Sequence, residues 1–416
     1  MKKKQDRRNI LFVANGGNYT GGYVIRIVSE IKTIRRSNVQ PILLYFLNIK
    51  NIVRNPLRTH KFIQYLDSNI ENLIVIPSIP FAKNFFIFKF SLWLMTIITM
   101  AIAKIYRIYR IHAEGYIAAI IAIRYKELTK TGFVFDIHGV YPEEIVLNWK
   151  ESKWKRDFYE WACSVEKCAI KKADHLIFVS NGMKHFFLEK YSNSEINNST
   201  IVPCCVDYEF YNFNNSDRDE IKKKLCTDNN IVYAYMGSID SWQCFDEVCS
   251  IFKGISTLEK DSTLLVLTNN RKLANQIMLE QNVDLSKVRL LSLTHDQVGL
   301  FLQAADLGFL IRKNHIVNLV SSPTKLSEYL AAGLPIITTE FAGDSYSIVK
   351  DTGIGIKIEL GEINYTNDLN LIINFAHIVK NNRNQYAKMC NHIAKNILAW
   401  SNYRQVILDC YDLEDK

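Results

Sequence analysis

Residues Ser321–Glu340 read SSPTKLSEYLAAGLPIITTE, and this stretch decides the fold of the chain. Two hydroxyl residues that can cap a helix precede Pro323, which suits the first helical position because no N–H is needed there. Gly333 predicts a left-handed residue after the helix, and a short buried strand is expected from Pro335 onward. The stretch therefore predicts helix, turn and strand, the repeating unit of an α/β domain.

Helical spacing divides the side chains of this helix between two faces. Leu326 and Leu330 lie one turn apart and should pack, whereas Lys325 and Glu328 share a face that need not be buried. Beside the carboxyl end of a parallel sheet, the N–H groups and the dipole of such a helix favour an anion. These residues alone leave two alternatives open, an anion site and an ordinary capped surface helix.

The rest of the chain alternates strand-like and helix-like patterns. Apolar runs typical of strands buried on both faces occur at 10–14, 41–47, 73–76, 132–137 and 175–179, and again at 231–236, 263–268, 288–293, 307–311 and 335–338. A polar stretch, Asn212–Asp219, separates the two series. We therefore predict two α/β halves with parallel sheets.

Composition narrows the class of protein. Lys and Arg (51) exceed Asp and Glu (42) in the 416 residues, which suits phosphate-bearing ligands or an anionic membrane surface. No long basic block interleaved with aromatics indicates a nucleic-acid partner. The nine cysteines include no C-x-x-C pair, which predicts reduced thiols in a cytosolic protein and no metal site. The motifs of P-loop NTPases, α/β-hydrolases and H-E-x-x-H metalloproteases are absent from the sequence.

A glycine-rich loop follows the first predicted strand. Asn15–Gly22 contains four glycines, ends with Gly21 and Gly22, and leads into a helical pattern. Such a loop lets the backbone approach a ligand phosphate, although a tight turn between strand and helix explains it as well.

Polar residues also end the predicted strand 132–137. Asp136 and His138 lie there, and Glu143 follows in the next turn. A histidine at this place can donate to a sugar or phosphate oxygen and titrates near neutral pH, and a nearby carboxylate can orient its ring. The alternative is a loop histidine bonded to backbone. Glu114 ends another strand-like stretch and poses the same choice.

The stretch Phe85–Ala103, FFIFKFSLWLMTIITMAIA, is apolar on nearly all sides. Its uncharged part, Phe90–Ala103, has 14 residues, fewer than the roughly 20 that a bilayer span needs. Basic residues flank or interrupt it, namely Lys83, Lys89, Lys104, Arg107 and Arg110. This composition suits a helix lying at a membrane interface, with a buried core helix and a true span as the alternatives.

Taken in order, these motifs resemble glycosyltransferase family 4. Ser321–Pro335 resembles the donor-binding motif of this family, S-x-P-T-K-x-x-E-Y-x-A-x-G-x-P. The other matching stretches are Gly21-Gly22, Asp136-Ile-His-Gly, Pro142-Glu-Glu, Val179-Ser-Asn-Gly-Met183, Val202-Pro-x-x-Val-Asp207 and Tyr235-Met-Gly-Ser238. The resemblance spans about the whole chain.

The resemblance implies an α/β protein of the GT-B fold, with two Rossmann-like domains that face each other across a cleft. Residues 1–205 would form the acceptor side and residues 206–385 the nucleotide-sugar side. A helical segment, 386–416, would return to the first domain with Trp400 and Tyr403.

The resemblance also implies an activity: a retaining transfer of sugar from a nucleotide-diphosphate donor to a lipid-linked or oligosaccharide acceptor. The product would be a bacterial cell-surface polysaccharide such as O-antigen or capsule. The enzyme would work at the cytoplasmic face of the inner membrane as a peripheral protein, with no metal or other cofactor and no nucleic-acid partner.

Site residues follow from the same resemblance. Glu328 would hold the nucleotide ribose, and Gly22, Lys325 and Arg312 would surround the donor diphosphate. His138 and Asp136 are the catalytic candidates. The rest of the donor-binding set is Gly21, Gly237, Ser238, Ser322 and Thr324, and the acceptor-side candidates are Glu143 and Glu114.

Two departures from the family pattern leave other functions open. Val320 stands where the family often carries a glutamate, and Ser238–Trp242 lacks the Arg and Lys that many members have after the strand ending at Gly237. We expect Arg312 and Lys325 to supply that positive charge. The alternatives are a GT-B nucleotide-sugar epimerase, which needs no acceptor, and an inactive glycosyltransferase-like scaffold.

Overall fold

The computed structural model describes residues 8–19, 21–35, 38–79, 84–147, 152–191, 196, 198–208, 211, 213–360 and 365–412. Its contacts divide the chain into two compact units. Unit 1 comprises Met1–Pro203 with Trp400–Lys416, and unit 2 comprises Cys204–Ala399. The first boundary thus falls after Pro203, not after residue 205. Residues 386–399 belong to unit 2, and only the chain from Trp400 onward belongs to unit 1.

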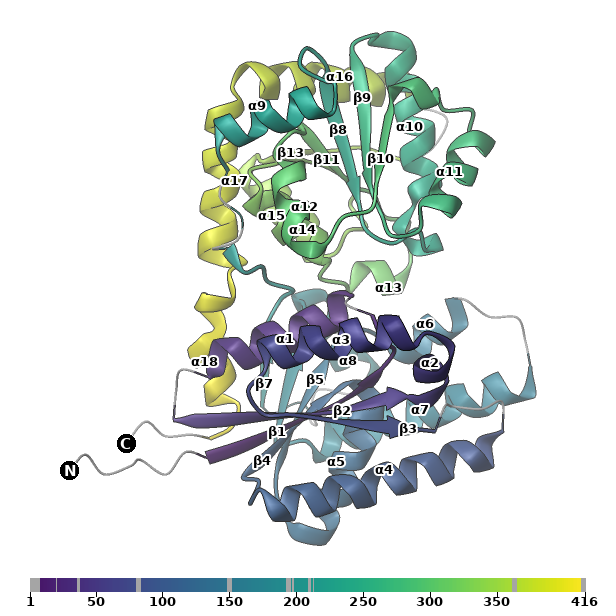
Figure 1. The fold of residues 1–416 in the computed structure, drawn as a ribbon, viewed down its shortest axis with the longest axis vertical. Coiled ribbons are helices and arrows are strands. Elements are labelled where there is room, and N and C mark those ends of the chain that lie inside the picture. The colour runs from purple at the N-terminus through teal and green to yellow at the C-terminus, as the bar shows by residue number, and fades with distance from the viewer. Residues whose placement is uncertain are drawn as a thin grey trace, which may run out of the picture. The chain divides into compact units, whose positions relative to one another are not determined.

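Unit 1 is built on a parallel seven-stranded sheet of order β3-β2-β1-β4-β5-β6-β7 (Figure 1). Its central strand β1 has five consecutive fully buried residues, Ile10–Ala14, because helices cover both faces of the sheet. Strand order reverses between β1 and β4, where sheets of this kind hold ligands. The strands are β1 (Arg8–Gly16), β2 (Val39–Asn48), β3 (Leu73–Ser78), β4 (Arg110–Glu114), β5 (Phe133–Ile137), β6 (His175–Phe178) and β7 (Ser199–Ile201).

The helices of unit 1 come from both ends of the chain. Helix α18 packs against α1, and the Tyr411 side chain that follows α18 is fully buried in unit 1. The helices are α1 (Gly22–Ile34), α2 (Ile49–Arg54), α3 (Pro56–Asn69), α4 (Phe85–Ile105), α5 (Gly115–Thr129), α6 (Tyr141–Leu147), α7 (Lys153–Lys172), α8 (Asn181–Tyr191), the 3₁₀ turn η5 (Trp400–Tyr403) and α18 (Arg404–Asp409).

Unit 2 is built on a parallel six-stranded sheet of order β10-β9-β8-β11-β12-β13. Its strands are β8 (Ile231–Met236), β9 (Ser262–Leu267), β10 (Val288–Leu291), β11 (Leu307–Leu310), β12 (Ile336–Thr338) and β13 (Gly355–Lys357). Its helices are α9 (Asn215–Lys224), η3 (Ser241–Gln243), α10 (Phe245–Leu258), α11 (Arg271–Glu280), η4 (Leu285–Lys287), α12 (His295–Leu302), α13 (Ile316–Leu319), α14 (Thr324–Ala331), α15 (Asp344–Thr352), α16 (Tyr365–Asn381) and α17 (Arg383–Ile397).

The predicted α/β class with two parallel sheets is confirmed, and each predicted apolar run coincides with a strand. Strands β4 and β7 had no counterpart among the predicted runs, although Glu114 was expected to end a strand-like stretch, and neither did strand β13. Its three residues, Gly355–Lys357, are half-buried and include a glycine and a lysine, so they do not form a continuous apolar run. The strand is fixed by pairing with β12, which sequence periodicity does not show.

The stretch 321–340 forms the expected helix, turn and strand as α14, Gly333 and β12. Helix α14 begins at Thr324, so Pro323 is its N-cap and not its first helical residue as predicted. Gly333 has a φ of 71°, as a left-handed residue requires. Lys325, on the face that need not be buried, has a side chain that is only 6% exposed.

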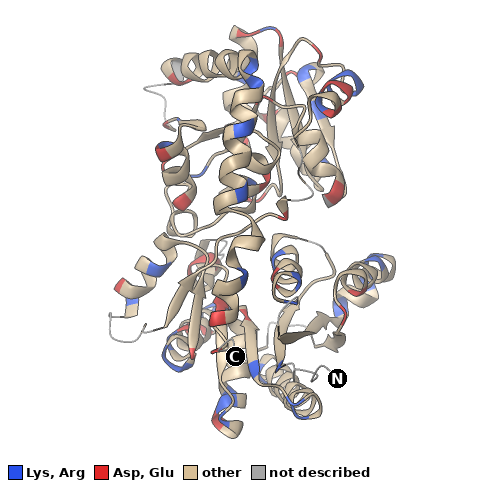
Figure 2. Ribbon diagram, turned by 90° about the vertical axis from the view of Figure 1, so that its left-hand side faces the viewer, with Lys and Arg blue, Asp and Glu red and all other residues tan. Residues whose placement is uncertain are grey.

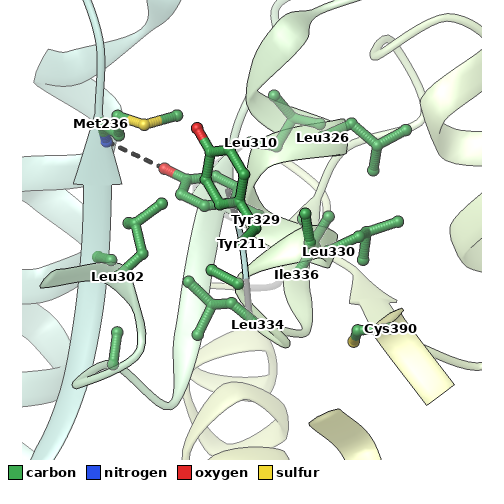
Figure 3. Packing of buried hydrophobic residues seen from close by; sticks show 14 of the residues in the cluster. Tyr211, Met236, Leu302, Leu310, Leu326, Tyr329, Leu330, Leu334, Ile336 and Cys390 are labelled. Carbon is green, nitrogen blue, oxygen red and sulfur yellow. Dashed lines mark hydrogen bonds between the residues drawn. The ribbon is translucent and has the colours of Figure 1, made fainter. Parts of the chain in front are cut away.

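One face of α14 packs into the core of unit 2 (Figure 3). Leu326, Tyr329 and Leu330 are buried there, and the Tyr329 hydroxyl accepts a hydrogen bond from the Met236 N–H at 3.0 Å. Met236 is the last residue of β8, so this bond fixes the helix against the carboxyl end of the central strand. The position of Lys325 and Glu328 follows from it.

Helix α4 has two different faces. Phe88, Leu92 and Met95 are buried, and Phe88 contacts Trp161 of α7 edge-on with ring centroids 4.7 Å apart. Large apolar side chains project from the other face at helical spacing, namely Phe86, Phe90, Trp93 and Ile97, each more than 40% exposed. Among the described residues, α4 is the one helix long and apolar enough to cross a membrane, and 33% of its apolar window is buried.

Candidate active site

The polar site of unit 1 lies where β4 and β5 end. Glu114 and Asp136 are direct partners in the register of these parallel strands. His138 follows β5, and its Nε2 lies 2.7 Å from the Glu114 carboxylate and 3.3 Å from that of Asp136. The Tyr23 ring stacks obliquely against the imidazole, with centroids 5.2 Å apart, and its hydroxyl donates to the Glu114 carbonyl at 3.1 Å. Two carboxylates and one tyrosine therefore fix the ring.

The charge of His138 is set by these carboxylates. Burial opposes its protonation, but Asp136 and Glu114 raise the pKa of His138 to about 10. The expectation that His138 titrates near neutral pH is therefore wrong, because the imidazolium persists well above pH 7. Its Nδ1 has no hydrogen-bond partner among the residues that the structure describes, and 18% of the side chain is exposed. His138 can thus donate a charged hydrogen bond to a ligand oxygen.

Arg26 of α1 lies behind this site. Its guanidinium donates to the Asp136 carboxylate at 3.1 Å and pairs with Glu30 at 2.9 Å. Burial by itself would raise the pKa of Asp136, but Arg26 and His138 hold it well below its usual range. Asp136 is fully buried beside His138, a place that suits a group orienting the imidazole, and its predicted catalytic role stays a prediction.

Arg26 also holds the places where the chain leaves and re-enters unit 1. Its Nη1 donates to the carbonyls of Val202 and Pro203, both at 3.1 Å, and its guanidinium lies over the Trp400 ring at 5.5 Å from the centroid. One side chain therefore joins both crossover segments to the Asp136–His138 pair.

Further buried groups surround Arg26. His112 Nδ1 lies 2.7 Å from the Tyr411 hydroxyl, and its Nε2 lies 3.6 Å from Glu30 and 3.4 Å from Glu114. Burial raises the pKa of Glu30 well above its usual range, although Arg26 opposes the shift. Arg26 and His138 thus lie among the buried carboxyl groups of Glu30, Glu114 and Asp136.

Glu30, His112, Glu114 and Asp136 lie close enough together to hold a metal ion. A divalent cation would have to sit beside the guanidinium of Arg26, which already contacts two of the four groups. Two cations already pair with these carboxyl groups, which favours a network of ion pairs over a metal centre.

The other two candidates of unit 1 differ in setting. Glu114 is 1% exposed and contacts His138, and its predicted acceptor-side role stays a prediction. Glu143 on α6 is partly exposed and pairs with Lys190 at 2.8 Å. Gly21 is the N-cap of α1 and Gly22 its first residue, so the glycine loop ends at a helix N-terminus as the sequence indicated.

The polar site of unit 2 centres on Lys325. Its ammonium lies 4.1 Å from the centre of the Tyr235 ring and forms no hydrogen bond or ion pair with any described residue. Burial, followed by repulsion from Arg312, lowers the pKa of Lys325 well below its usual value. A buried ammonium without an anion is costly, so this position calls for a negative ligand.

The backbone around Lys325 is shaped to receive it. Gly237 directly follows β8 and has a φ of 121°, and a Cβ at this position would lie 2.6 Å from Lys325 Cε. Ser238 follows, and its carbonyl accepts a hydrogen bond from the Tyr235 hydroxyl at 2.6 Å. Only glycine therefore allows the lysine to lie against the end of β8.

Arg312 provides a second cation at the same edge of the sheet, directly after β11. Its side chain is 3% exposed, and its Nη1 donates to the carbonyl of Ile311 at 2.9 Å. No carboxylate pairs with Arg312 within the described part of the chain. Burial lowers the pKa of Arg312 slightly, but a guanidinium stays charged.

The remaining donor-side candidates lie on or near α14. Glu328 is partly exposed, and its carboxylate accepts a hydrogen bond from the Tyr211 hydroxyl at 3.3 Å. Ser322 accepts from the Cys204 N–H at 2.9 Å, so it holds the segment that enters unit 2, and Thr324 opens the helix. Val320 is 2% exposed and caps α13, so its side chain is part of the core.

Three residues of the site were missed by sequence analysis. Arg26 and Glu30 are four apart on α1, a spacing that indicates an ion pair but not that the pair is buried. Tyr235 looked like an ordinary strand residue. No local signal could identify it as the platform under Lys325, because the contact joins β8 to α14.

The fold is shared with solved glycosyltransferases. The chain aligns with HepE of Anabaena, crystallised with UDP-glucose, at 15% identity and a TM-score of 0.71, covering 97% of this chain and 99% of that one. A glycosyltransferase of Rickettsia africae aligns at 14% and 0.70, covering 99% and 100%. WaaG, a glycosyltransferase of lipopolysaccharide biosynthesis, aligns at 15% and 0.66, covering 98% and 100%. No curated protein sequence matches this chain.

The fold is that of GT-B glycosyltransferases, as the resemblance implied. Residues 52–210 match the model of Glycosyltransferase Family 4.

Proposed function

We propose that this glycosyltransferase moves a sugar from a nucleotide-diphosphate-sugar donor to a lipid-linked or oligosaccharide acceptor in the synthesis of a cell-surface polysaccharide, such as O-antigen or capsule. The observation that carries the proposal is the buried ammonium of Lys325, which no described residue pairs, beside the buried guanidinium of Arg312. A diphosphate supplies the negative charge that both cations lack.

The donor would lie across the N-terminal end of α14. Lys325 and Arg312 would contact the diphosphate, and the free N–H groups at the start of α14 would add to the attraction. The Glu328 carboxylate, held by Tyr211, would accept hydrogen bonds from the ribose hydroxyls. Gly237, Ser238, Ser322 and Thr324 would line the same region through backbone or hydroxyl groups. The UDP and UDP-glucose complexes of HepE make UDP the first nucleotide to test.

The proposed reaction retains the anomeric configuration. The bond from the sugar C1 to the diphosphate oxygen breaks as the acceptor oxygen attacks from the same face, and the acceptor proton passes to the departing phosphate oxygen. Lys325 and Arg312 stabilise the charge on the leaving group, so no metal is required. The charged Nδ1–H of His138 would donate to an oxygen of the sugar or the acceptor, and Glu143 is the acceptor-side candidate that keeps partial exposure.

Nucleotide binding tests the proposal. A thermal-shift comparison of UDP, GDP, ADP and CMP should show stabilisation by at least one diphosphate, since a ligand at 100 times its Kd adds about 2.7 kcal/mol. Lys325→Met should abolish the shift and Glu328→Gln should reduce it. Lys313→Met, which removes an exposed lysine next to Arg312, is the control and should leave the shift unchanged. Absence of any shift in the wild type would contradict the proposal.

Catalysis is tested with the nucleotide sugar that binds. Transfer should require an acceptor, persist in EDTA, and give a product whose anomeric configuration by NMR equals that of the donor. Turnover of the nucleotide sugar without an acceptor would indicate an epimerase, and binding without turnover would indicate a scaffold.

We further propose that the enzyme attaches peripherally to the cytoplasmic face of the inner membrane through α4. The support is the apolar stripe of Phe86, Phe90, Trp93 and Ile97, together with the exposed flanking cations Lys89, Lys104 and Arg107. The opposite face of α4 is packed on unit 1, which suits a helix lying in the interface better than one spanning the bilayer. Lys83, another predicted flanking cation, lies outside the described residues.

Flotation with vesicles containing anionic lipid tests this attachment. Changing Phe86, Phe90 and Trp93 to Ser should release the protein from the vesicles. Leu92 is unsuitable for substitution because it is 1% exposed and belongs to the core. Changing the exposed Val53 and Leu57 of α2 and α3 to Ser provides a control with similar loss of apolar surface elsewhere. Equal flotation of all three proteins would refute attachment through α4.

A further inference from the structure

Unit 2 contains a polar pocket away from the start of α14. The pocket has a volume of about 450 Å³ and lies between α9 and the junction of α16 with α17. Its charged lining residues are the cations Arg218, Lys380 and Arg383 and one carboxylate, Asp219. The other lining residues are asparagines and a glutamine, which bind anions as hydrogen-bond donors.

Arg383 is the central group of this pocket. It is only 8% exposed, and its Nη1 donates to the Gly333 carbonyl at 2.6 Å. Its guanidinium lies over the Phe213 ring at 4.5 Å from the centroid. The Nε and Nη2 atoms have no hydrogen-bond partner among the described residues. A buried guanidinium with two unused nitrogens is poised for an anion.

Positive charge around Arg383 is only partly balanced. The buried carboxylate of Asp306 pairs with Arg218 at 2.6 Å and lies 4.0 Å from the Lys222 ammonium, so one anion faces two cations. Burial lowers the pKa of Lys222 to about 8, although Asp306 opposes the shift, and Arg218 and Lys380 lower it further. Burial, followed by repulsion from Arg218, lowers the pKa of Arg383 to about 10. An added anion would relieve this repulsion.

The N-terminus of α17 opens at the same pocket. Asn382 is its N-cap but makes no side-chain cap hydrogen bond, and Asn382, Arg383 and Asn384 all line the pocket. The helix has 15 residues, so its dipole adds positive potential at this end. Lys and Arg recur along α17, the long helix facing the viewer in Figure 2.

We propose that this pocket binds a small phosphate-bearing anion, either free phosphate or the phosphate group of a sugar phosphate, at a site separate from the donor site. The same Arg383 side chain holds the carbonyl of Gly333, which ends the helix that carries Lys325 and Glu328. Helix α17 approaches this turn closely, because a Cβ on Gly333 would lie 3.0 Å from that of Ala387. The pocket thus lies next to the C-terminal end of α14, the helix whose N-terminal end is the proposed donor site.

Calorimetric titration of the full chain with inorganic phosphate and with glucose 6-phosphate, at constant ionic strength, tests the site. Lys380→Met should raise the Kd about tenfold, because it removes one charged hydrogen-bond donor. Asp219→Asn should lower the Kd about threefold by removing the repelling carboxylate. Tighter binding of glucose 6-phosphate than of inorganic phosphate would indicate that the pocket takes a sugar phosphate. Equal binding of the two would indicate that it recognises the phosphate group alone.

Two controls separate this site from other sources of binding. Lys388→Met removes an exposed lysine from the same helix outside the pocket and should leave the Kd unchanged. Lys325→Met removes the cation of the proposed donor site and should leave phosphate binding at the pocket intact. This result should hold even if the proposal of a nucleotide-sugar donor is wrong. An equal effect of Lys380→Met and Lys388→Met, or loss of all phosphate binding in Lys325→Met, would overturn the inference.

Discussion

The two polar sites, one in each unit, differ in how their cations are paired. In unit 1, Arg26 and His138 both contact buried carboxylates. In unit 2, Lys325 and Arg312 contact no carboxylate within the described residues. The first site is therefore organised before any ligand arrives, whereas the second lacks the anion that would complete it. We therefore expect a ligand to stabilise unit 2 more than unit 1.

This contrast predicts different responses to mutation. Removing a cation from a balanced buried network leaves a carboxylate without its partner and costs stability. Removing a cation that has no partner relieves a desolvation cost and should stabilise the unit while destroying binding.

Arg26→Met should lower the free energy of unfolding by about 3–5 kcal/mol, because Asp136 and Glu30 lose their buried partner. Urea denaturation measures the loss. Arg35→Met, which breaks an exposed pair with Glu71 at the end of the same helix, should cost less than about 1 kcal/mol. Arg26→Lys should recover part of the stability. Equal costs for Arg26→Met and Arg35→Met would show that the network is not the source of stability.

Lys325→Met should act in opposite directions on stability and binding. Donor affinity should fall about a hundredfold, or about 2.7 kcal/mol, while the free energy of unfolding stays equal or rises. The lowered pKa of Lys325 also predicts how donor affinity depends on pH. The diphosphate needs the protonated lysine, so wild-type affinity should weaken as pH rises through that pKa. Calorimetry in buffers of different ionisation enthalpy should detect proton uptake on binding. A fall in stability would contradict the unpaired state of this lysine.

His138→Gln should have the smallest of the three effects, and one that depends on pH. The pKa of His138 is raised from 6.5 to about 10 on folding, so its contribution to stability is fully present below pH 6.5 and is lost as pH rises to about 10. The difference in unfolding free energy between wild type and variant should be on the order of 2 kcal/mol at pH 6 and should vanish near pH 10. A difference independent of pH would show that the imidazolium is not paired in the folded state.

Much of the fold was predictable because it depends on local patterns. Buried parallel strands read as continuous apolar runs, and Ile10–Ala14 and Ile231–Met236 show this plainly. Gly333 indicated the end of α14, because only a residue tolerant of positive φ fits there. Strand β13 was less predictable, since it depends on pairing with β12.

The candidate sites were also only partly predictable from the sequence. The residue types were visible in the sequence, as were their places after strands, and His138, Lys325 and Glu328 lie where those patterns put them. Their surroundings were not visible. Glu114 meets Asp136 through strand register, Arg26 reaches both from α1, and Tyr235 comes to lie under Lys325 across the sheet.

The sequence by itself determined the two-sheet α/β architecture and the loops that carry polar groups, because hydrophobic period and glycine positions act over a few residues. Tertiary structure alone decided the charge state of those groups, since a pKa depends on burial and on neighbours distant in the chain. It placed His138 between two carboxylates, buried Asp136 and Glu114 beside it, and buried the Lys325 amine without a hydrogen-bond partner among the described residues. Those states, more than the residue types, define what each unit can bind.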